Sequence, residues 1–220
     1  MRKENITMLQ SIKMCYDKAG PRVVEALRRN HFDAYYFSNR EEAVEKIMEL
    51  IPAEDTVSWG GTATVDELGI KDLLRQRGQA LLDRDTAKDA SERMSIMRQG
   101  LLADTFLMSS NAITEEGELY NIDGNGNRVA ALCFGPKSVI VVAGMNKVVA
   151  DMDAAYSRVR HLAAPANAQR FAGLKTPCAV TGQCGNCRST DCICAYLVAT
   201  RVSRPAGKIK VILIGENLGI

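Results

Sequence analysis

Hydrophobic positions recur along this chain with the two spacings that distinguish helices from strands. The segment 4–19 carries Ile6, Leu9, Ile12 and Tyr16 at helical spacing and predicts a helix that ends at Gly20-Pro21. Short apolar or aromatic runs bounded by turn residues predict strands. Further helices are expected at 21–30, 39–51, 65–77, 91–102 and 147–163, and strands at 33–38, 56–59, 79–82, 105–109 and 138–144.

This alternation predicts an α/β fold with an open, mostly parallel, Rossmann-like sheet. The run SVIVVAG at 138–144 is apolar on both faces, which is typical of a strand covered by helices on two sides. Beyond Pro165 a cysteine-rich excursion leads to two β-like runs, 195–202 and 209–214, which predict a terminal hairpin. We therefore divide the chain into an N-terminal helix, an α/β core, and a cysteine-rich segment with a hairpin that completes the same domain (1–20, 21–164 and 165–220).

Composition and charge exclude several classes of protein. With 220 residues, 46% of them hydrophobic and 25% charged, the chain is typical of a globular domain with one core. A net charge of +2 without a polybasic block argues against nucleic-acid binding. The apolar runs are too short to span a membrane, and the charged N-terminus is unlike a signal peptide, so a cytoplasmic location is expected.

The first candidate site is the glycine turn WGGTAT at 59–64, between a predicted strand and a predicted helix. Gly60 and Gly61 allow close approach to the backbone, while Thr62 and Thr64 offer hydroxyl groups. An anion binds well at such a place. The alternative is a tight turn with a threonine cap, and the turn matches neither the dinucleotide fingerprint nor the Walker pattern.

Two further turns offer polar side chains. In the run 109–128, Asn111 is a candidate ligand contact and Glu115 a candidate base, although EEGE and DGNGN equally fit the turns of a hairpin. At the next turn, Gly144 and Asn146 are candidate substrate contacts, and Lys147 can offer its ammonium to a phosphate or carboxylate. Alternatively, Asn146 is only a helix cap and Lys147 a solvated side chain.

Five of the seven cysteines fall within seventeen residues: Cys178, Cys184, Cys187, Cys192 and Cys194. The C-x2-C pair at 184 and 187 has the spacing at which two thiolates reach one metal, so an iron–sulfur cluster or zinc is expected. The alternatives are a redox pair of thiols or unreactive cysteines. Cys15 and Cys133 are expected to be small core residues, and His31 and His161 to lie at helix ends.

The stretches WGGTATVDELG, SSNAITEEGELYNIDGNGNRVA and VIVVAGMNKVVADMDAAYSRV together resemble the LUD family of lactate-utilization proteins. The likeness extends over roughly residues 10–220. It implies the fold shared with ribose-5-phosphate isomerase, CoA transferases and formyltetrahydrofolate cyclo-ligase (the NagB/RpiA/CoA transferase-like type). Family members take part in the oxidation of L-lactate to pyruvate, commonly with iron–sulfur partner subunits, but the family supplies no proven catalytic residue.

Three functions follow from these residues and this resemblance. The first is a lactate-utilization protein that binds a small anionic metabolite and contributes to electron-transfer-linked oxidation of L-lactate. The second is a transferase or isomerase acting on a phosphate- or CoA-bearing molecule, with Glu67 or Glu115 as base or nucleophile and Lys147 for the anion. The third is a non-catalytic assembly or regulatory subunit that docks an iron–sulfur protein.

Overall fold

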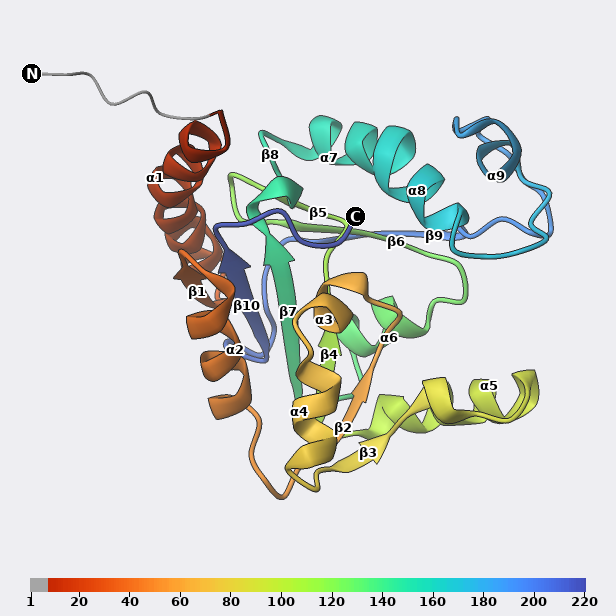
Figure 1. Cartoon of the computed structure of the whole chain (residues 1–220), viewed down its shortest axis with the longest axis horizontal. Helices are drawn as coiled ribbons and strands as arrows, with labels where there is room; N and C mark the ends of the chain where they lie inside the picture. The colour runs from red at the N-terminus through yellow and green to blue at the C-terminus, as the bar shows by residue number, and fades with distance from the viewer. Residues whose placement is uncertain (1–7) are drawn as a thin grey trace, which may run out of the picture.

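The computed structural model describes residues 8–220 and is organised around a six-stranded parallel sheet (Figure 1). The strand order is β1-β10-β7-β4-β2-β3. The strands are β1 (Asp33–Phe37), β10 (Ile209–Ile214), β7 (Ser138–Gly144), β4 (Thr105–Met108), β2 (Thr56–Trp59) and β3 (Ala80–Leu82). The predicted Rossmann-like α/β fold with a parallel sheet is confirmed.

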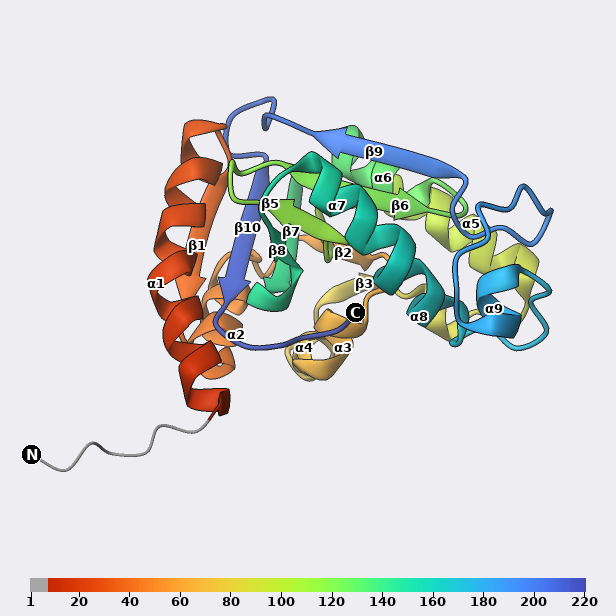
Figure 2. The same ribbon diagram turned by 90° about the horizontal axis from the view of Figure 1, so that it is seen from above.

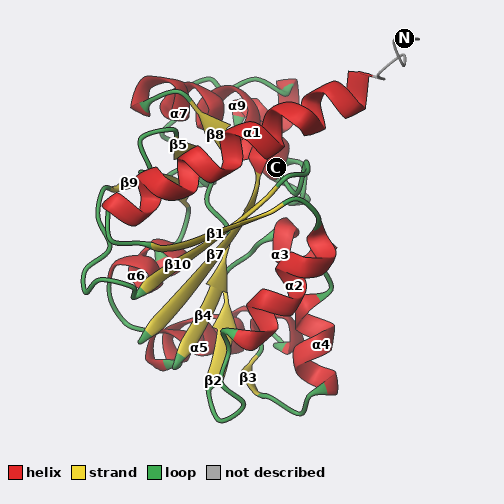
Figure 3. Cartoon of the chain, turned by 90° about the vertical axis from the view of Figure 1, so that its left-hand side faces the viewer, coloured by secondary structure: helices red, strands yellow, loops and turns green. Residues whose placement is uncertain are grey.

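Helices cover both faces of this sheet, as the view in Figure 3 shows. On one face lie α1 (Met8–Arg29) and α6 (Asn127–Cys133), and on the other lie α2 (Arg40–Glu49), α3 (Ala63–Glu67) and α4 (Ile70–Gln76). The helix α5 (Ala90–Gln99) packs beside β3 at the edge of the sheet. Because both faces are covered, the central strands are apolar on both sides.

The strand β7 shows this double burial directly. Val139 and Val141 belong to the core under α1 and α6, whereas Ile140 and Val142 belong to the core under α2, α3 and α4. Successive side chains of a strand point to opposite faces, so the continuous apolar run fills both cores. The interpretation of SVIVVAG as a strand buried on two sides is confirmed.

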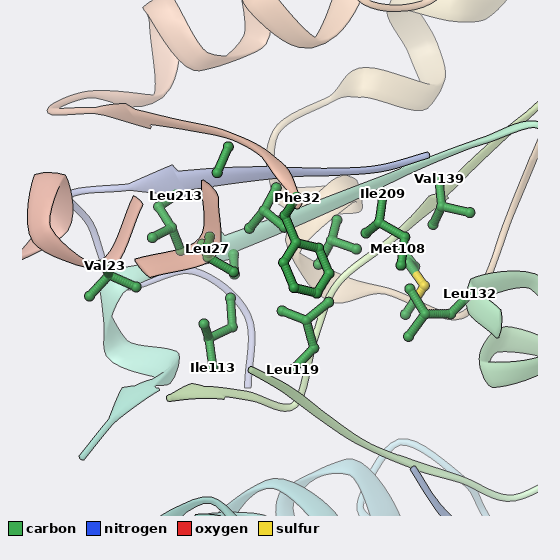
Figure 4. Packing of buried hydrophobic residues seen from close by; sticks show 14 of the residues in the cluster. Val23, Leu27, Phe32, Met108, Ile113, Leu119, Leu132, Val139, Ile209 and Leu213 are labelled. Atoms are coloured by element: carbon green, nitrogen blue, oxygen red, sulfur yellow. The ribbon is translucent and has the colours of Figure 1, made fainter. Parts of the chain in front are cut away.

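A second, four-stranded sheet lies across the first, in the order β8-β5-β6-β9 (Figures 1 and 2). Its strands are β8 (Val148–Val149), β5 (Ala112–Thr114), β6 (Leu119–Asp123) and β9 (Tyr196–Thr200). The antiparallel pair β5 and β6 confirms the hairpin predicted for the polar run. Ile113 and Leu119 of this hairpin pack against Leu27 and Phe32 in the core under α1 and α6 (Figure 4).

The outer face of the second sheet is covered by one long helical segment. It consists of α7 (Met152–Arg158), a π-helical turn at 159–163 and α8 (Ala164–Ala168), and the short helix α9 (Pro177–Thr181) follows. Ala155 and Val159 pack there against Ala112 and Ile122. Among residues 8–220, no helix has both the length and the apolar character needed to cross a membrane.

The structure corrects several predicted elements. The predicted terminal hairpin is wrong, because β9 pairs with β6 in the second sheet while β10 lies between β1 and β7 in the first. The predicted helix end at Gly20-Pro21 is also wrong, since α1 runs through both residues; positions 4–7 of the predicted helix lie outside the described residues. The segment from Lys147 enters β8, and α7 begins only at Met152 with Asp151 as its cap.

Gly117, in the turn between β5 and β6, fits closely against α1. Its φ is +80°, and a β-carbon there would lie 2.5 Å from the backbone nitrogen of Leu27. Gly117→Ala should therefore lower the free energy of unfolding by roughly 1–2 kcal/mol for the left-handed backbone and by roughly 1–3 kcal/mol more for the steric overlap. The measurement is urea denaturation of the purified variant.

Gly78→Ala is the matched control for this prediction. Gly78 also has a positive φ, +72°, but a β-carbon there would meet no atom within 4 Å. The Gly78→Ala variant should lose only the roughly 1–2 kcal/mol of unfolding free energy that comes from the left-handed backbone. Equal losses in the two variants would contradict the close packing of the β5–β6 turn against α1.

Candidate functional site

A polar cleft of about 930 Å³ opens at the carboxyl ends of β2, β4 and β7. The turn after β2, the residues after β4 and Lys147 beyond β7 form its floor. The end of β6, the helix α8 and the cysteine-rich segment form the opposite wall. Open parallel sheets commonly bind ligands at this edge, because turns from several strands meet there.

Lys147 is buried at the floor of the cleft. It lies in the 3-10 turn η3 (Met145–Lys147) and is only 3% exposed. Its Nζ donates to Thr64 Oγ1 and to Ser109 Oγ, both at 3.0 Å. Lysine is rarely buried without a carboxylate partner, so this placement is unusual for a purely structural residue.

Burial, together with the positive charges of Arg158 and Arg128, lowers the pKa of Lys147 from 10.5 to about 7, against the opposing charge of Glu67. Loss of hydration disfavours the charged form of an amine, and a neighbouring cation has the same effect. The neutral amine and the ammonium are therefore both populated near neutral pH.

Arg128 joins the floor of the cleft to the second sheet. Its Nη1 donates to Ser109 O at 2.8 Å and Asn121 Oδ1 at 2.7 Å, and its Nη2 donates to Asn111 Oδ1 at 2.8 Å and Ile122 O at 2.7 Å. Burial lowers its pKa, but a guanidinium remains charged at physiological pH. This cation is held by neutral oxygen atoms.

Arg84 lies in the 3-10 turn η1 (Arg84–Thr86) after β3 and also lines the cleft. Its side chain is 14% exposed, and its buried Nε has no hydrogen-bond partner. The nearest carboxylate oxygen, Asp85 Oδ1, lies 3.7 Å from Nε, which is too long for a hydrogen bond. Nη1 meets only the weak acceptor Met97 Sδ, at 3.4 Å.

The carboxylate of Asp85 is occupied by other donors. It accepts from Lys71 Nζ at 2.7 Å and from the indole Nε1 of Trp59 at 3.0 Å. Burial raises its pKa, but these hydrogen bonds outweigh burial, and the net pKa of Asp85 is lowered. Lys71 is paired with Asp66 and Asp85, whereas Arg84 and Lys147, like Arg128 and Arg170 in the same lining, have no hydrogen-bonded carboxylate within the described part of the chain.

The structure places four of the predicted site residues in the lining of this cleft. Gly61, Thr62, Asn111 and Lys147 line the cleft. Thr64 holds Lys147 by the hydrogen bond described above, and Thr62 Oγ1 accepts from Val65 N as the cap of α3. With only five residues, α3 is too short to add the field of a long helix to an anion site.

Other predicted positions serve close packing. A β-carbon at Gly60 would lie 2.9 Å from Arg128 Cδ, so Gly60 leaves room for that side chain. At Gly144 a β-carbon would collide with Glu216 O and Asn146 Oδ1. Asn146 Oδ1 accepts from Leu218 N at 3.1 Å, and its place is against the C-terminal segment 216–219.

The two predicted carboxylates lie outside the cleft lining. Glu67 is exposed at the end of α3, where its Oε2 accepts from Gly219 N at 2.9 Å. Glu115 is exposed after β5 and borders a separate hollow of about 420 Å³ against α1. The structure does not bring Glu115 together with Lys147.

The cysteine-rich segment forms part of the cleft wall, through residues 189–193 and Ala195. Burial raises the pKa of Cys194 to about 12, and the nearby thiols of Cys192, Cys178 and Cys184 contribute to the shift. These three thiols therefore lie close enough to influence Cys194. Within residues 8–220, no three Cys, His, Asp or Glu side chains are placed as ligands of one metal ion.

The two cysteines outside this segment differ from expectation. Cys15 and Cys133 are both exposed, so their prediction as core residues is wrong. Each belongs to a helix whose apolar stripe faces the sheet, and the cysteine lies off that stripe. His31 follows α1 as predicted, with a φ of +63°, whereas His161 lies inside the helical run between α7 and α8.

Comparison with known proteins identifies the family. The LUD domain model matches residues 20–214, which is most of the chain. The chain belongs to the LUD domain family. The crystal structure of a DUF162 family protein from Deinococcus radiodurans is similar to this LUD protein with a TM-score of 0.53 and 14% sequence identity, over 90% of this chain and 98% of that one. At this identity the similarity shows the fold alone, and no curated protein matches the chain.

Sequence reasoning missed three basic residues of this LUD protein's site. Arg84 follows the predicted strand 79–82, so its position at a strand end was the available signal. Arg128 opens a helix and Arg158 closes one, where a basic residue is ordinary. Only the fold shows that the charges of Arg128 and Arg158 reach Lys147.

Lys147→Met should make the free energy of unfolding of the LUD protein less dependent on pH. The pKa of Lys147 is about 7 in the folded protein and 10.5 in the unfolded chain, so between these values the unfolded chain binds more protons. The free energy of unfolding of the wild type should therefore rise with pH across this window, by up to roughly 1.4 kcal/mol per pH unit relative to the variant.

The measurement is urea denaturation of wild type and Lys147→Met at pH values between 6 and about 10. The stability advantage of the variant should be largest below pH 7 and should shrink as the pH rises. A constant difference across the range would show that the amine is not titrating in the folded protein.

Proposed function

We propose that the cleft binds a small anionic metabolite, with L-lactate and pyruvate as the first class to test, and that the protein contributes to electron-transfer-linked oxidation of lactate. The observation that supports binding most strongly is Arg84, a cation of the cleft wall whose buried Nε has no hydrogen-bond partner. A buried donor without a partner costs free energy, and a ligand carboxylate would supply the missing acceptor. Membership of the LUD family supports the choice of lactate.

The hydrogen-bonding groups at the cleft floor suit a 2-hydroxy or 2-oxo acid whose carboxylate is bound by Arg84. Lys147 Nζ and the hydroxyls of Ser109 and Thr64 are joined by hydrogen bonds at the cleft floor. These groups can donate to, or accept from, an oxygen on the second carbon of such an acid.

The size of the cleft leaves a second candidate open. About 930 Å³ is near the top of the range of roughly 300–1,000 Å³ for small-molecule sites, and exceeds what lactate alone requires. A phosphate- or CoA-bearing substrate of a transferase or isomerase would use more of this space. Its predicted bases, Glu67 and Glu115, lie outside the cleft lining, so the hydroxy acid remains our first proposal.

Arg84→Gln should weaken anion binding by roughly ten- to one-hundredfold, because a charge-assisted hydrogen bond contributes about 1.5–3 kcal/mol. Isothermal titration of L-lactate, pyruvate and coenzyme A into wild type and variant measures this. Arg28→Gln is the matched control, since Arg28 lies on α1, pairs with Glu25 and is outside the cleft.

Each outcome of these titrations distinguishes the candidate functions. Binding of lactate or pyruvate that weakens only in Arg84→Gln supports the proposal. Binding of coenzyme A alone favours the transferase, whereas equal affinity of both variants for all ligands contradicts an anion site at Arg84. Tight binding without turnover, even with an added electron acceptor, favours the assembly subunit.

We further propose that the cysteine-rich segment carries an iron–sulfur cluster or zinc, which would supply electron transfer or a structural tie, respectively. In support, the thiols of Cys178, Cys184 and Cys192 lie close enough to Cys194 to contribute to the raised pKa of Cys194. Because these side chains are not yet grouped as ligands, binding requires the irregular stretch 182–195 to close around the metal. An iron–sulfur protein partner and a cytoplasmic location stay predictions from the sequence.

Protein purified without oxygen should contain iron with acid-labile sulfide, or zinc, and Cys194→Ser should lose most of it. Elemental analysis and the visible spectrum measure both. Cys133→Ser is the control, because Cys133 is an exposed cysteine on α6, outside the cysteine-rich segment. Absence of metal from the anaerobic wild type would contradict this proposal and favour redox-active thiols.

A further inference from the structure

We propose that Lys147 is a nucleophilic amine that forms an imine with the carbonyl carbon of a 2-oxo acid bound in the cleft. This inference rests on the proposed function for the position of the acid, and it adds a covalent step and a named reacting atom. Imine formation needs an unprotonated amine, a reachable carbonyl and a path for protons. The structure offers observations on each of these requirements.

The surroundings of Lys147 favour the unprotonated amine. The residue is 3% exposed and donates only to hydroxyl oxygens, so no carboxylate holds it as an ammonium through a hydrogen bond. Arg128 on α6 and Arg158 on α7 disfavour its positive charge, and Glu67 on α3 is the opposing acid. A desolvated lysine beside other cations is the arrangement that activates an amine for carbonyl chemistry.

Hydrogen bonding leaves the nitrogen lone pair available. A neutral amine has two N–H bonds and one lone pair, and the two donors are satisfied by Thr64 Oγ1 and Ser109 Oγ, each at 3.0 Å. An ammonium would have a third donor, for which no acceptor is present among these contacts. The geometry thus accounts for both hydrogens of the neutral form and leaves the lone pair for a carbonyl carbon.

The fold fixes the position of this amine. The turn that carries Lys147 is held by Asn146, whose Oδ1 accepts from Leu218 N, while Asn146 O accepts from Arg158 Nε at 3.3 Å. Gly219 lies over the same group, since a β-carbon there would be 3.2 Å from Lys147 Nζ. An amine held in place on a rigid element loses little entropy when it meets a bound carbonyl.

The reaction balances without an oxidant. The lone pair of Lys147 Nζ attacks the second carbon of the acid, and the carbonyl electron pair moves to its oxygen, which takes up the first proton released by nitrogen and gives a carbinolamine. The second nitrogen proton then passes to that hydroxyl, which leaves as water as the carbon–nitrogen double bond of the imine forms. Ser109 and Thr64 can pass these protons, because Thr64 Oγ1 lies 3.4 Å from Ser109 Oγ and both contact the amine.

The direct test is reductive trapping with pyruvate and sodium cyanoborohydride. Intact-mass measurement should show one reduced pyruvate adduct per chain, and peptide mapping should place it on Lys147. Because the pKa of this amine is about 7, labelling should be efficient at neutral pH and should fall as the pH drops below that value. Lys147→Arg, which keeps a cation but cannot form the imine, should lose the adduct.

Lys46→Met is the control, because Lys46 lies on α2, pairs with Glu49 and is outside the cleft lining. It should retain the adduct on Lys147. Labelling spread over surface lysines and unchanged in Lys147→Arg would overturn the proposal. Mapping of the wild type gives this answer even where a variant fails to fold.

A titration with pyruvate in the absence of reductant separates the two proposals. Pyruvate that binds without forming an adduct overturns the imine and leaves the proposed anion site intact. If pyruvate neither binds nor labels, both the anion site for this acid and the imine are overturned. Binding together with an adduct on Lys147 supports both.

Discussion

The site depends on the buried guanidinium of Arg128. Its two terminal nitrogens donate to four oxygen atoms, which belong to Ser109 and Asn111, beyond the end of β4, and to Asn121 and Ile122 in β6. This network joins the parallel sheet to the second sheet where the cleft opens, and Gly60 leaves the space that the side chain occupies. Removing the Arg128 side chain would leave several buried acceptors without hydrogen-bond partners. The contact between the two sheets therefore depends on this particular side chain.

The same cation also sets the chemistry of its neighbour. Arg128 is held by neutral oxygens, with its closest carboxylate oxygen, Asp123 Oδ2, 3.9 Å from Nε, so its charge is only partly compensated. In a poorly hydrated interior this charge acts over several ångströms and disfavours a second positive charge on Lys147. The residue that joins the two sheets therefore also lowers the pKa of Lys147.

The fold was largely readable from the sequence, because hydrophobic spacing reports which faces are covered. The run 138–144 showed double burial, and of the two runs offered as turns of a hairpin, EEGE joins β5 to β6 whereas DGNGN leads into α6. The partner of a strand is not encoded in its own alternation, so β9 was assigned to β10 when it pairs with β6. At Gly20-Pro21 the packing of Val23, Val24 and Leu27 against the sheet outweighs the local tendency to end the helix.

The site was less readable, because a glycine or asparagine at a strand end has two uses that look alike in sequence. Gly61 and Asn111 face the cleft, whereas Gly60 makes room for Arg128 and Asn146 anchors the C-terminal segment. The decisive basic residues, Arg84 and Arg128, reach the site from segments more than forty residues apart in sequence. The pairing of β2 with β3 and β4 places Arg84 at this edge of the sheet, and hydrogen bonds to Ser109 O and Asn111 Oδ1 bring Arg128 there from α6.

The cysteine-rich segment forms part of the cleft wall, so the cleft is not built by the parallel sheet alone. One end of the segment is fixed, because Gln169 Nε2 donates to Cys178 O at 2.9 Å and Cys178 is buried. Its other end, with Cys192, lines the same cleft as Arg84 and Lys147. A change in the bonding of these thiols would therefore act on a surface that the proposed anion would touch. The proposed anion site and the proposed thiol or metal chemistry share this surface, so each is expected to alter the free energy of the other.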